Sequence, residues 1–443
     1  MKDVDIIISG GAVLTLDSGN GLIEKGFVAV KGDTIVGVGS GNGQDCCRAA
    51  RLIDASRSIV MPGLINGHTH AAMTCFRGMA DDLKLEDWLN NYIFPAEAKN
   101  VNPELVYWGS LLACAEMIRS GTTTFCDMYI FEEETARAAR KAGMRCLIGE
   151  VLFDFPSPSC PTPEEGLSYT RRLLEQYDDD PLISVIVEPH ALYTCSTELL
   201  KQARALADEF TAPLGIHLLE TAWERKSLEE KLGIGAVGYL DNLGFLNERF
   251  IAFHCVALSD ADIRLFAERG CSVIHNPESN MKLASGVAPV QEMIDQGVVV
   301  GLGTDGCASN NNLDMLQEMD IAAKLQKVHR LDPAVMKAER VVSMATSVGS
   351  RALGLNGFVG SLKEGMKADI IIIDCNQPHL TPLYNPHSHL VYAAKGADVK
   401  TVIINGRIVM DNRLILSFDE QEAMDRVRRI ALGVQKSLER RAP

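Results

Sequence analysis

The residues best suited to chemistry in this sequence are two histidines that stand two positions apart, His68 and His70. They follow a mostly apolar run, residues 58–65. Side chains at positions i and i+2 of a strand point to the same face, so both imidazoles can reach one ion. Histidine nitrogens are common ligands of zinc and related divalent metals. The pair therefore predicts half of a mononuclear metal site, and the other ligands must come from later segments.

The middle of the chain alternates short apolar segments with stretches of helical periodicity. This alternation predicts an α/β fold, and eight such units predict a closed (β/α)8 barrel of the TIM type. The barrel is expected to span residues 59–359. Its predicted strands are residues 59–68, 122–128, 145–153, 183–190, 213–219, 250–257, 272–276 and 298–305.

The two ends of the chain share a different pattern, in which short β-branched runs are broken by glycine. Asn405-Gly406 between two such runs is a strong hairpin signal. We expect residues 1–58 and 360–412 to build one small β-sandwich domain together. Residues 413–443, with Glu and Arg at helical spacing, are expected to form a C-terminal helical tail.

Polar side chains end several of the predicted strands, and a barrel carries its chemistry at the carboxyl ends of its strands. His217 and Asp305 end strands five and eight, and with the first pair they offer three nitrogens and one oxygen. Such a set suits one zinc ion, although Fe(II) and Mn(II) use the same ligand types. Three more histidines stand at the ends of strands four, six and seven: His190, His254 and His275.

Composition limits the classes of partner. The formal net charge is −15, which leaves no basic surface for a phosphate backbone, so nucleic acid is not expected as a partner. The twelve cysteines are scattered without a CxxC pair, which is typical of thiols in a reducing compartment. The first residues include acids where a signal peptide needs basic residues, and no apolar run reaches about 18 residues. We therefore expect a cytoplasmic protein with no membrane partner.

Several motifs resemble those of the amidohydrolase superfamily. Among its branches they are most similar to the 5-methylthioadenosine/S-adenosylhomocysteine deaminases. The likeness extends over almost the whole chain, and the motifs occur in the expected order. They are residues 62–70, 215–220, 254–256, 276–286 and 301–306.

The resemblance implies a role for each polar strand end. Bound metal would activate a water for attack on C6 of an adenine ring. Glu220 would carry a proton to N1 of the ring, and His254 would orient the water and stabilise developing charge. Asp305 would pass the proton of the water towards the departing ammonia. The implied metal ligands are His68, His70, His217 and Asp305.

The resemblance also implies one ion and a set of substrate contacts. Two-metal members carry a modified lysine at the end of strand four, and residues 183–190 contain no lysine. Glu97 and His190 would bind ribose hydroxyls, since a carboxylate accepts from both hydroxyls of a diol. Trp88 would either close over the base or its sulfur substituent, or pack in the core. Glu220 would contact the ring itself.

The expected activity is hydrolytic deamination of a 5′-modified adenosine such as 5′-methylthioadenosine, S-adenosylhomocysteine, adenosine or 5′-deoxyadenosine. Some relatives place an arginine just after strand three, and residues 149–158 contain none. That departure counts against the carboxylate-tailed S-adenosylhomocysteine and leaves less polar 5′-substituted adenosines open.

Other readings of the sequence stay open. Deaminases of guanine and hydrolases of s-triazines share the metal ligands, and a barrel without catalysis is a remoter alternative. A second HxH pair, His387 and His389, is expected in a loop rich in Pro and Asn and is interpreted as structural or as a loop contact. The oligomeric state is undecided, and a homo-oligomer is compatible with the sequence.

Overall fold

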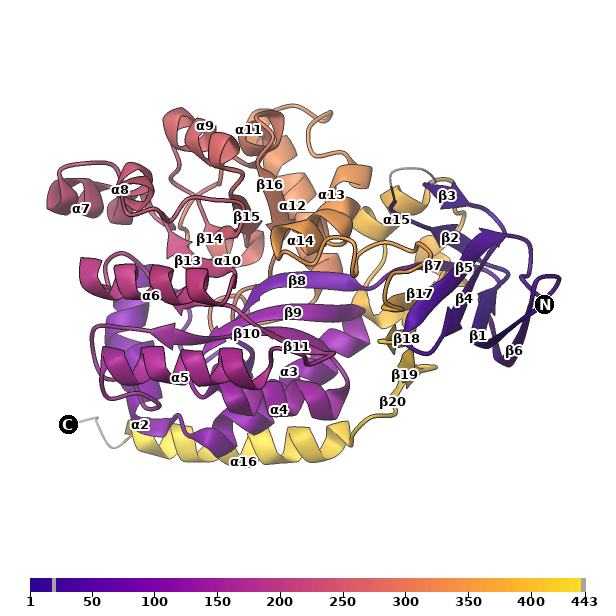
Figure 1. The fold of residues 1–443 in the computed structure, drawn as a ribbon, viewed down its shortest axis with the longest axis horizontal. Coiled ribbons are helices and arrows are strands. Elements are labelled where there is room, and N and C mark those ends of the chain that lie inside the picture. The colour runs from indigo at the N-terminus through magenta and orange to yellow at the C-terminus, as the bar shows by residue number, and fades with distance from the viewer. Residues whose placement is uncertain (18–20, 440–443) are drawn as a thin grey trace.

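The centre of the molecule consists of two parallel sheets (Figure 1). The structure is a computed structural model that describes residues 1–17 and 21–439. One sheet has the order β11-β10-β9-β8, with β12 also paired to β10, and the other has the order β13-β14-β15-β16. Their strands are β8 (Leu64–Thr69), β9 (Thr122–Tyr129), β10 (Arg145–Leu152), β11 (Ile183–Val185), β12 (Glu188–Pro189), β13 (Leu214–Leu218), β14 (Phe250–His254), β15 (Ser272–His275) and β16 (Val299–Leu302).

Backbone hydrogen bonds join the two parallel sheets at both of their neighbouring edges. Parallel bridges link Val187 to Leu214 and Ala191 to His217 on one side. On the other side, the amide of Asp305 donates to the carbonyl of His68 over 2.9 Å. The ends of β8, β13 and β16 are thereby brought to the same region.

Helices connect successive parallel strands, and several begin at a residue whose side chain caps the helix. Asn102, Thr162 and Ser259 each cap a helix by accepting from a backbone N–H of its first turn. The connecting helices are α3 (Pro103–Ser120), α4 (Glu132–Ala142), α5 (Pro163–Gln176), α6 (Thr197–Glu209), α7 (Ala222–Leu232), α8 (Ala236–Asn242), α9 (Asp260–Arg269), α10 (Pro277–Lys282) and α11 (Val290–Asp295). The last parallel strand is followed by α12 (Met315–Arg330), α13 (Ala338–Met344) and α14 (Ser347–Ala352).

A helical segment between β8 and α3 lies at the same end of the parallel strands as the polar residues. It contains a π-helical turn, a form often found at functional sites. The C-terminal helix α16 (Glu420–Glu439) runs along the lower edge of the molecule and packs on this segment and on α3 (Figure 1). The elements of the segment are η1 (Ala71–Phe76), α1 (Leu85–Asp87), η2 (Trp88–Ile93) and α2 (Phe94–Asn100).

Both ends of the chain contribute to two further sheets, which lie to one side of the parallel ones (Figure 1). One apolar cluster includes Ile8 and Val28 from the first sheet and Val60 and Ile372 from the second. The first sheet has the order β5-β4-β1-β6, from β1 (Lys2–Ser9), β4 (Gly26–Lys31), β5 (Thr34–Ser40) and β6 (Cys47–Asp54). The second has the order β20-β19-β18-β17-β7-β2-β3, from β2 (Ala12–Leu14), β3 (Leu22–Ile23), β7 (Ser58–Pro62), β17 (Ile370–Asp374), β18 (Val399–Ile404), β19 (Arg407–Asp411) and β20 (Leu414–Ile415).

The return segment between β17 and β18 holds three short helices, and β18 and β19 pair as the hairpin predicted at Asn405-Gly406. The short helices are η3 (Pro378–Leu380), α15 (Pro386–Tyr392) and η4 (Gly396–Asp398). No helix within residues 1–17 and 21–439 has both the length and the apolarity needed to cross a membrane. The twelve cysteines are free thiols, of which Cys46 alone is exposed.

Two predicted strands differ from the observed ones. The predicted strand of residues 59–68 is two strands, because β7 pairs with β2 and β17 while β8 pairs with β9. The change of sheet occurs at Gly63, where a Cβ atom would lie 2.1 Å from Oγ1 of Thr123. The predicted strand of residues 183–190 is interrupted between β11 and β12.

The predicted helical tail of residues 413–443 also differs from the observed structure. Leu414 and Ile415 form β20 at the edge of the seven-stranded sheet. Within the described part of the tail, residues 413–439, the helix covers Glu420–Glu439 alone. Residues 440–443 of the predicted tail lie outside the described residues.

Candidate active site

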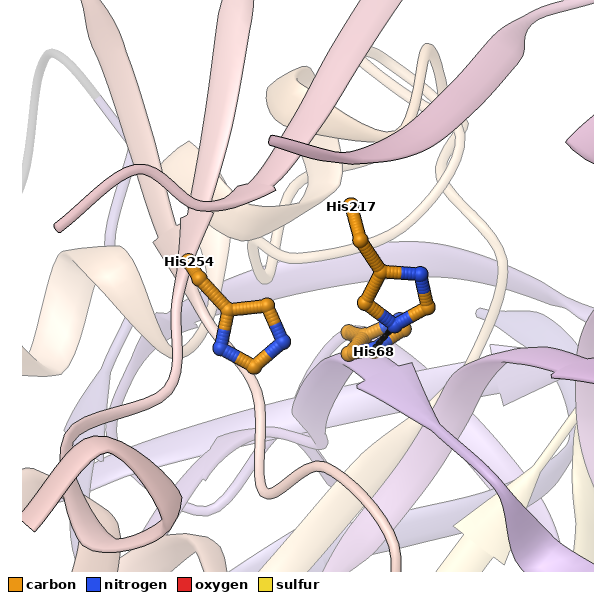
Figure 2. A group of neighbouring side chains, drawn as sticks. All are labelled: His68, His217 and His254. Carbon is orange, nitrogen blue, oxygen red and sulfur yellow. Dashed lines mark hydrogen bonds between the residues drawn. The ribbon is translucent and has the colours of Figure 1, made fainter. Parts of the chain in front are cut away.

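Four ligand-type side chains converge at the carboxyl ends of the parallel strands. Nε2 of His68 lies 3.1 Å from Nε2 of His217, and the two rings meet at these nitrogens in Figure 2. Oδ1 of Asp305 lies 3.1 Å from Nε2 of His70 and 3.6 Å from that of His68. Two nitrogens bound to one tetrahedral zinc ion are about 3.3 Å apart, given Zn–N bonds of about 2.0 Å. The spacing of the four groups therefore fits one metal ion.

Hydrogen bonds at Nδ1 of His70 and His217 orient Nε2 of each ring towards the place where the four groups meet. Nδ1–H of His70 donates to the carbonyl of Met128, and Nδ1–H of His217 donates to the carbonyl of His190 over 3.0 Å. A carbonyl can only accept, so both rings carry a proton on Nδ1 and turn Nε2, the atom that would bind a metal, towards the other groups. The ring of His68 stacks on buried Phe253, with centroids 4.0 Å apart.

Three of the four groups have the protonation states of metal ligands. Burial holds the pKa of His68 and of His217 well below the usual value, so both rings are neutral. Burial by itself would raise the pKa of Asp305, but the hydrogen bond from His70 and the nearby imidazoles hold it well below its usual range. Neutral imidazoles and an ionised carboxylate are the forms that bind divalent metals. In His70 burial lowers the pKa, but the hydrogen bond and charge of Asp305 raise it to about 9, so a metal would displace the proton on Nε2.

Asp305 is held in place from several sides. Its Oδ2 accepts from the hydroxyls of Ser279 (2.6 Å) and Ser309 (2.8 Å), and its Oδ1 accepts from the amide of Gly306 (2.8 Å). Its φ of +62° lies in the left-handed region, which non-glycine residues rarely adopt. Such a conformation costs about 1–3 kcal/mol and is typical of functional sites.

Asp127 holds the backbone around the HxH pair and was not among the site residues predicted from the sequence. This buried carboxylate at the end of β9 accepts from Oγ1 of Thr69 (2.5 Å) and from the amide of Ala71 (2.6 Å). These two donors flank His70 on either side. The available signal was a single charged residue near the end of the otherwise uncharged run of residues 122–128.

Glu220 and His254 lie beside the four ligand-type groups. Oε1 of Glu220 is 3.9 Å from Nδ1 of His254, and burial raises the pKa of the Glu220 carboxyl. The amide of Glu220 donates to Oε2 of Glu224 over 2.8 Å. Nδ1–H of His254 donates to Oδ1 of Asn280 over 2.9 Å, and the ring lies beside His68 and His217 in Figure 2. Asn280 and Glu224 were not predicted, because nothing local in the sequence marks either as a partner of these groups.

A cavity of about 610 Å³ opens onto these groups, a size suited to a small-molecule ligand. Apolar side chains such as Met128, Val151 and Leu283 form much of its wall. All the predicted site residues except the more deeply buried His68 line it: Trp88, Glu97, His70, His190, His217, Glu220, His254 and Asp305.

Two of the predicted substrate contacts, Trp88 and Glu97, stand on the segment between β8 and α3, whereas the ring of His190 lies 4.8 Å from that of His217. Oε1 of Glu97 accepts from the hydroxyl of Tyr129 over 2.7 Å, and burial raises the pKa of Glu97 to about 7. His190 contacts Oγ1 of Thr194 over 2.9 Å, and burial lowers its pKa to about 3. Trp88 is 5% exposed, so it contributes both to the wall and to the core.

The remaining histidines of interest lie outside this cavity. His275 ends β15 and is fully buried. His387 and His389 lie in α15, so the expected loop there is a helix.

The comparisons with known proteins agree with this geometry. The chain is 63% identical over 439 residues to 5-methylthioadenosine/S-adenosylhomocysteine deaminase 1 of Syntrophus aciditrophicus, with 99% of each chain covered. It is 46% identical over 429 residues to the 5′-deoxyadenosine deaminase of Methanosarcina barkeri, covering 96% of this chain and 98% of that one. The crystal structure of a zinc-bound adenosine deaminase from Xanthomonas campestris superposes with a TM-score of 0.96 at 37% identity, covering 98% of this chain and 99% of that one. The amidohydrolase family model matches residues 59–409, and the chain belongs to this family.

Proposed function

We propose that this protein is a metal-dependent aminohydrolase that converts 5′-modified adenosines into the inosine analogues and ammonia. The observation that carries the proposal is the convergence of four ligand-type groups at the floor of the cavity that the buried acid Glu220 lines. The relatives named above for 5-methylthioadenosine, 5′-deoxyadenosine and adenosine support a nucleoside substrate. The net charge of −15 supports a small-molecule partner over a nucleic acid.

We also propose how the sheets are organised into domains. Residues 59–359 would form a closed (β/α)8 barrel, which the hydrogen bonds between the two parallel sheets support. Residues 1–58 and 360–412 would form a β-sandwich, which the apolar cluster shared by the two end sheets supports.

In the proposed reaction, a divalent ion, most simply one zinc, would be held by His68, His70, His217 and Asp305. When bound, it supplies a Lewis acid that lowers the pKa of a water. Glu220 delivers a proton to N1 of the ring, and its raised pKa suits a group that must gain and lose that proton. His254, fixed by Asn280, orients the water and stabilises developing charge. Asp305 takes up the proton of the water and passes it to the leaving ammonia.

The substrate is held at the other side of the cavity. Glu97 accepts from the ribose hydroxyls, and His190 contacts the same sugar. The apolar wall and Trp88 exclude water from the adenine ring, which strengthens the polar contacts around it.

The experiment is an assay of ammonia release from adenosine, 5′-deoxyadenosine, 5′-methylthioadenosine and S-adenosylhomocysteine, with guanine and an s-triazine as the competing substrates. We expect release from adenosines alone, and protein carrying about one metal ion per chain. Glu220→Gln is expected to bind metal normally and to lose at least about 100-fold in kcat. Absence of ammonia from every adenosine with metal supplied would refute the proposal, and release from guanine or the triazine alone would favour those classes.

A further inference from the structure

A second cavity of about 960 Å³ opens beside the active-site cavity. The two cavities share four lining residues: Leu85, Leu89, Phe94 and Tyr193. The wall of the outer cavity is formed by α1, η2 and the start of α2, together with residues that follow β10, β12 and β13. The two cavities therefore adjoin each other along these four side chains.

Aromatic rings line the way from the inner to the outer cavity. The ring of Phe153 lies 4.9 Å from that of His190, which belongs to the inner cavity. Phe153 stacks on Phe155 with centroids 4.5 Å apart, and Phe94 packs against Phe155 at 5.8 Å. At the mouth, Phe155 and Trp223 are 38% and 53% exposed, so apolar surface is open to a ligand there.

The charges at the outer cavity are all negative. Of its lining residues, Glu86 and Glu224 are the charged ones, and none is Lys, Arg or His. The carboxyl of Glu224 is buried and accepts from the backbone amides of Leu219 and Glu220, and burial raises its pKa to about 7, so Glu86 is the carboxylate that opposes a ligand charge. An anionic group placed here would face Glu86 without a cationic partner, whereas an apolar group would cover aromatic surface.

The placement of the nucleoside follows from the proposed function, on which this inference rests. C6 of the ring lies at the strand ends next to Glu220, and the ribose lies near Glu97 and His190. The 5′ carbon then points away from Glu220, towards the row of rings that begins at Phe153.

We propose that the outer cavity receives the 5′ substituent and selects against a carboxylate on it. The enzyme accordingly acts on adenosines with an uncharged 5′ group, such as an alkyl thioether, in preference to those with an amino-acid tail. Phe155 and Trp223 bind the substituent, and Glu86 opposes an anionic one.

The test uses 5′-thioether adenosines of matched length that carry butyl, 3-carboxypropyl or 3-aminopropyl groups, with the 5′-methylthio compound as reference. Burial of each extra CH2 raises kcat/KM by up to about fourfold, so butyl should equal or exceed methyl. A carboxylate about 8 Å from a partly buried like charge should lower kcat/KM about 30-fold relative to butyl. The aminopropyl compound should fall between the two, because its charge is attracted by Glu86 but its ammonium loses solvation.

The variants test the named residues. Phe155→Arg places a guanidinium at the mouth and should raise the carboxypropyl-to-butyl ratio of kcat/KM at least about tenfold. Glu86→Gln removes the like charge and should raise the same ratio by up to about 30-fold. Tyr384→Arg is the matched control, because Tyr384 is 89% exposed and lines neither cavity, and it should leave the ratio unchanged.

The outcomes separate this inference from the proposed function. Equal kcat/KM for the carboxypropyl and butyl compounds in the unaltered enzyme would overturn the inference while leaving the deaminase activity established. A ratio that changes in neither Phe155→Arg nor Glu86→Gln would overturn it as well. No ammonia from any compound of the series, including the 5′-methylthio reference, would overturn the proposed function itself.

Discussion

Asp127 offers the sharpest test of how the two ligand-type residues of the HxH pair are held. Replacement by Ala removes the acceptor of the Thr69 hydroxyl and of the Ala71 amide. The hydroxyl keeps a second acceptor, the carbonyl of Cys126 at 2.9 Å, but the amide begins η1 and has no carbonyl within that helix to bond. One buried N–H without a partner costs about 1–3 kcal/mol, so we expect about 2 kcal/mol of lost stability.

Asp127→Ala should also weaken metal binding. Residues that orient metal ligands typically contribute about 10- to 100-fold in metal affinity, and Asp127 orients the backbone on both sides of His70. Chelator competition would measure the zinc affinity, and urea unfolding of the metal-free protein would measure the stability. Asp127→Asn keeps an Oδ1 acceptor and should retain most of the affinity. Thr170→Ala, which removes a buried hydroxyl bonded within α5, is the control that should leave zinc binding unchanged. Folded Asp127→Ala protein with unaltered zinc affinity would refute the reasoning.

Three further predictions concern the rest of the molecule. Arg145 forms a buried, two-point ion pair with Asp369 between β10 and the seven-stranded sheet, so Arg145→Ala should lower the free energy of unfolding by about 3–5 kcal/mol; an unchanged urea midpoint would contradict this. Burial raises the pKa of the Glu97 carboxyl from 4.5 to about 7 in the folded protein. The protonated carboxyl therefore leaves stability intact below pH 4.5, and the free energy of unfolding falls by about 3 kcal/mol as the pH rises through 7. Glu97→Gln should therefore gain stability over the unaltered protein between pH 5 and about pH 8, and parallel pH curves for the two would exclude this cause. Removal of bound metal should lower Tm, since ligand at 100 times its Kd stabilises by about 2.7 kcal/mol; equal Tm values with and without chelator would show that these groups hold no metal in solution.

The strand ends could be predicted from the sequence because buried parallel strands leave continuous apolar runs. When such a run ends in His or Asp, the polar residue must lie at the common carboxyl edge of the sheet. His217 and Asp305 were found in this way, and the structure places both beside His68. The positions followed from local pattern, although the roles of these residues rest on the proposed function.

The parts that could not be predicted depend on contacts distant in sequence. Residues 59–68 are apolar whichever sheet they join, and the change of sheet at Gly63 reflects its close approach to Thr123. Asp127 acts through Thr69, 58 positions away, and Asn280 through His254, 26 positions away, so no spacing rule connects them with the histidines they support. Helical periodicity likewise does not show that the segment carrying Trp88 and Glu97 lies over the strand ends.

The residues proposed for the reaction stand on or just after strands, whereas those proposed for substrate choice stand on segments beyond the strand ends. The two properties should therefore change independently. Glu220 and the four ligand-type groups stand on or just after hydrogen-bonded parallel strands, so small displacements there would misalign the groups proposed to react. Glu86, Phe155 and Trp223 stand on segments beyond those strand ends, where a side chain can change without moving the strands. Substitution of Glu220 should therefore abolish ammonia release from every adenosine, whereas substitution of Phe155 or Glu86 should change the order in which adenosines are preferred. A Phe155→Arg variant that lost all activity on every adenosine while remaining folded would show that the outer cavity and the reaction are not separable in this way.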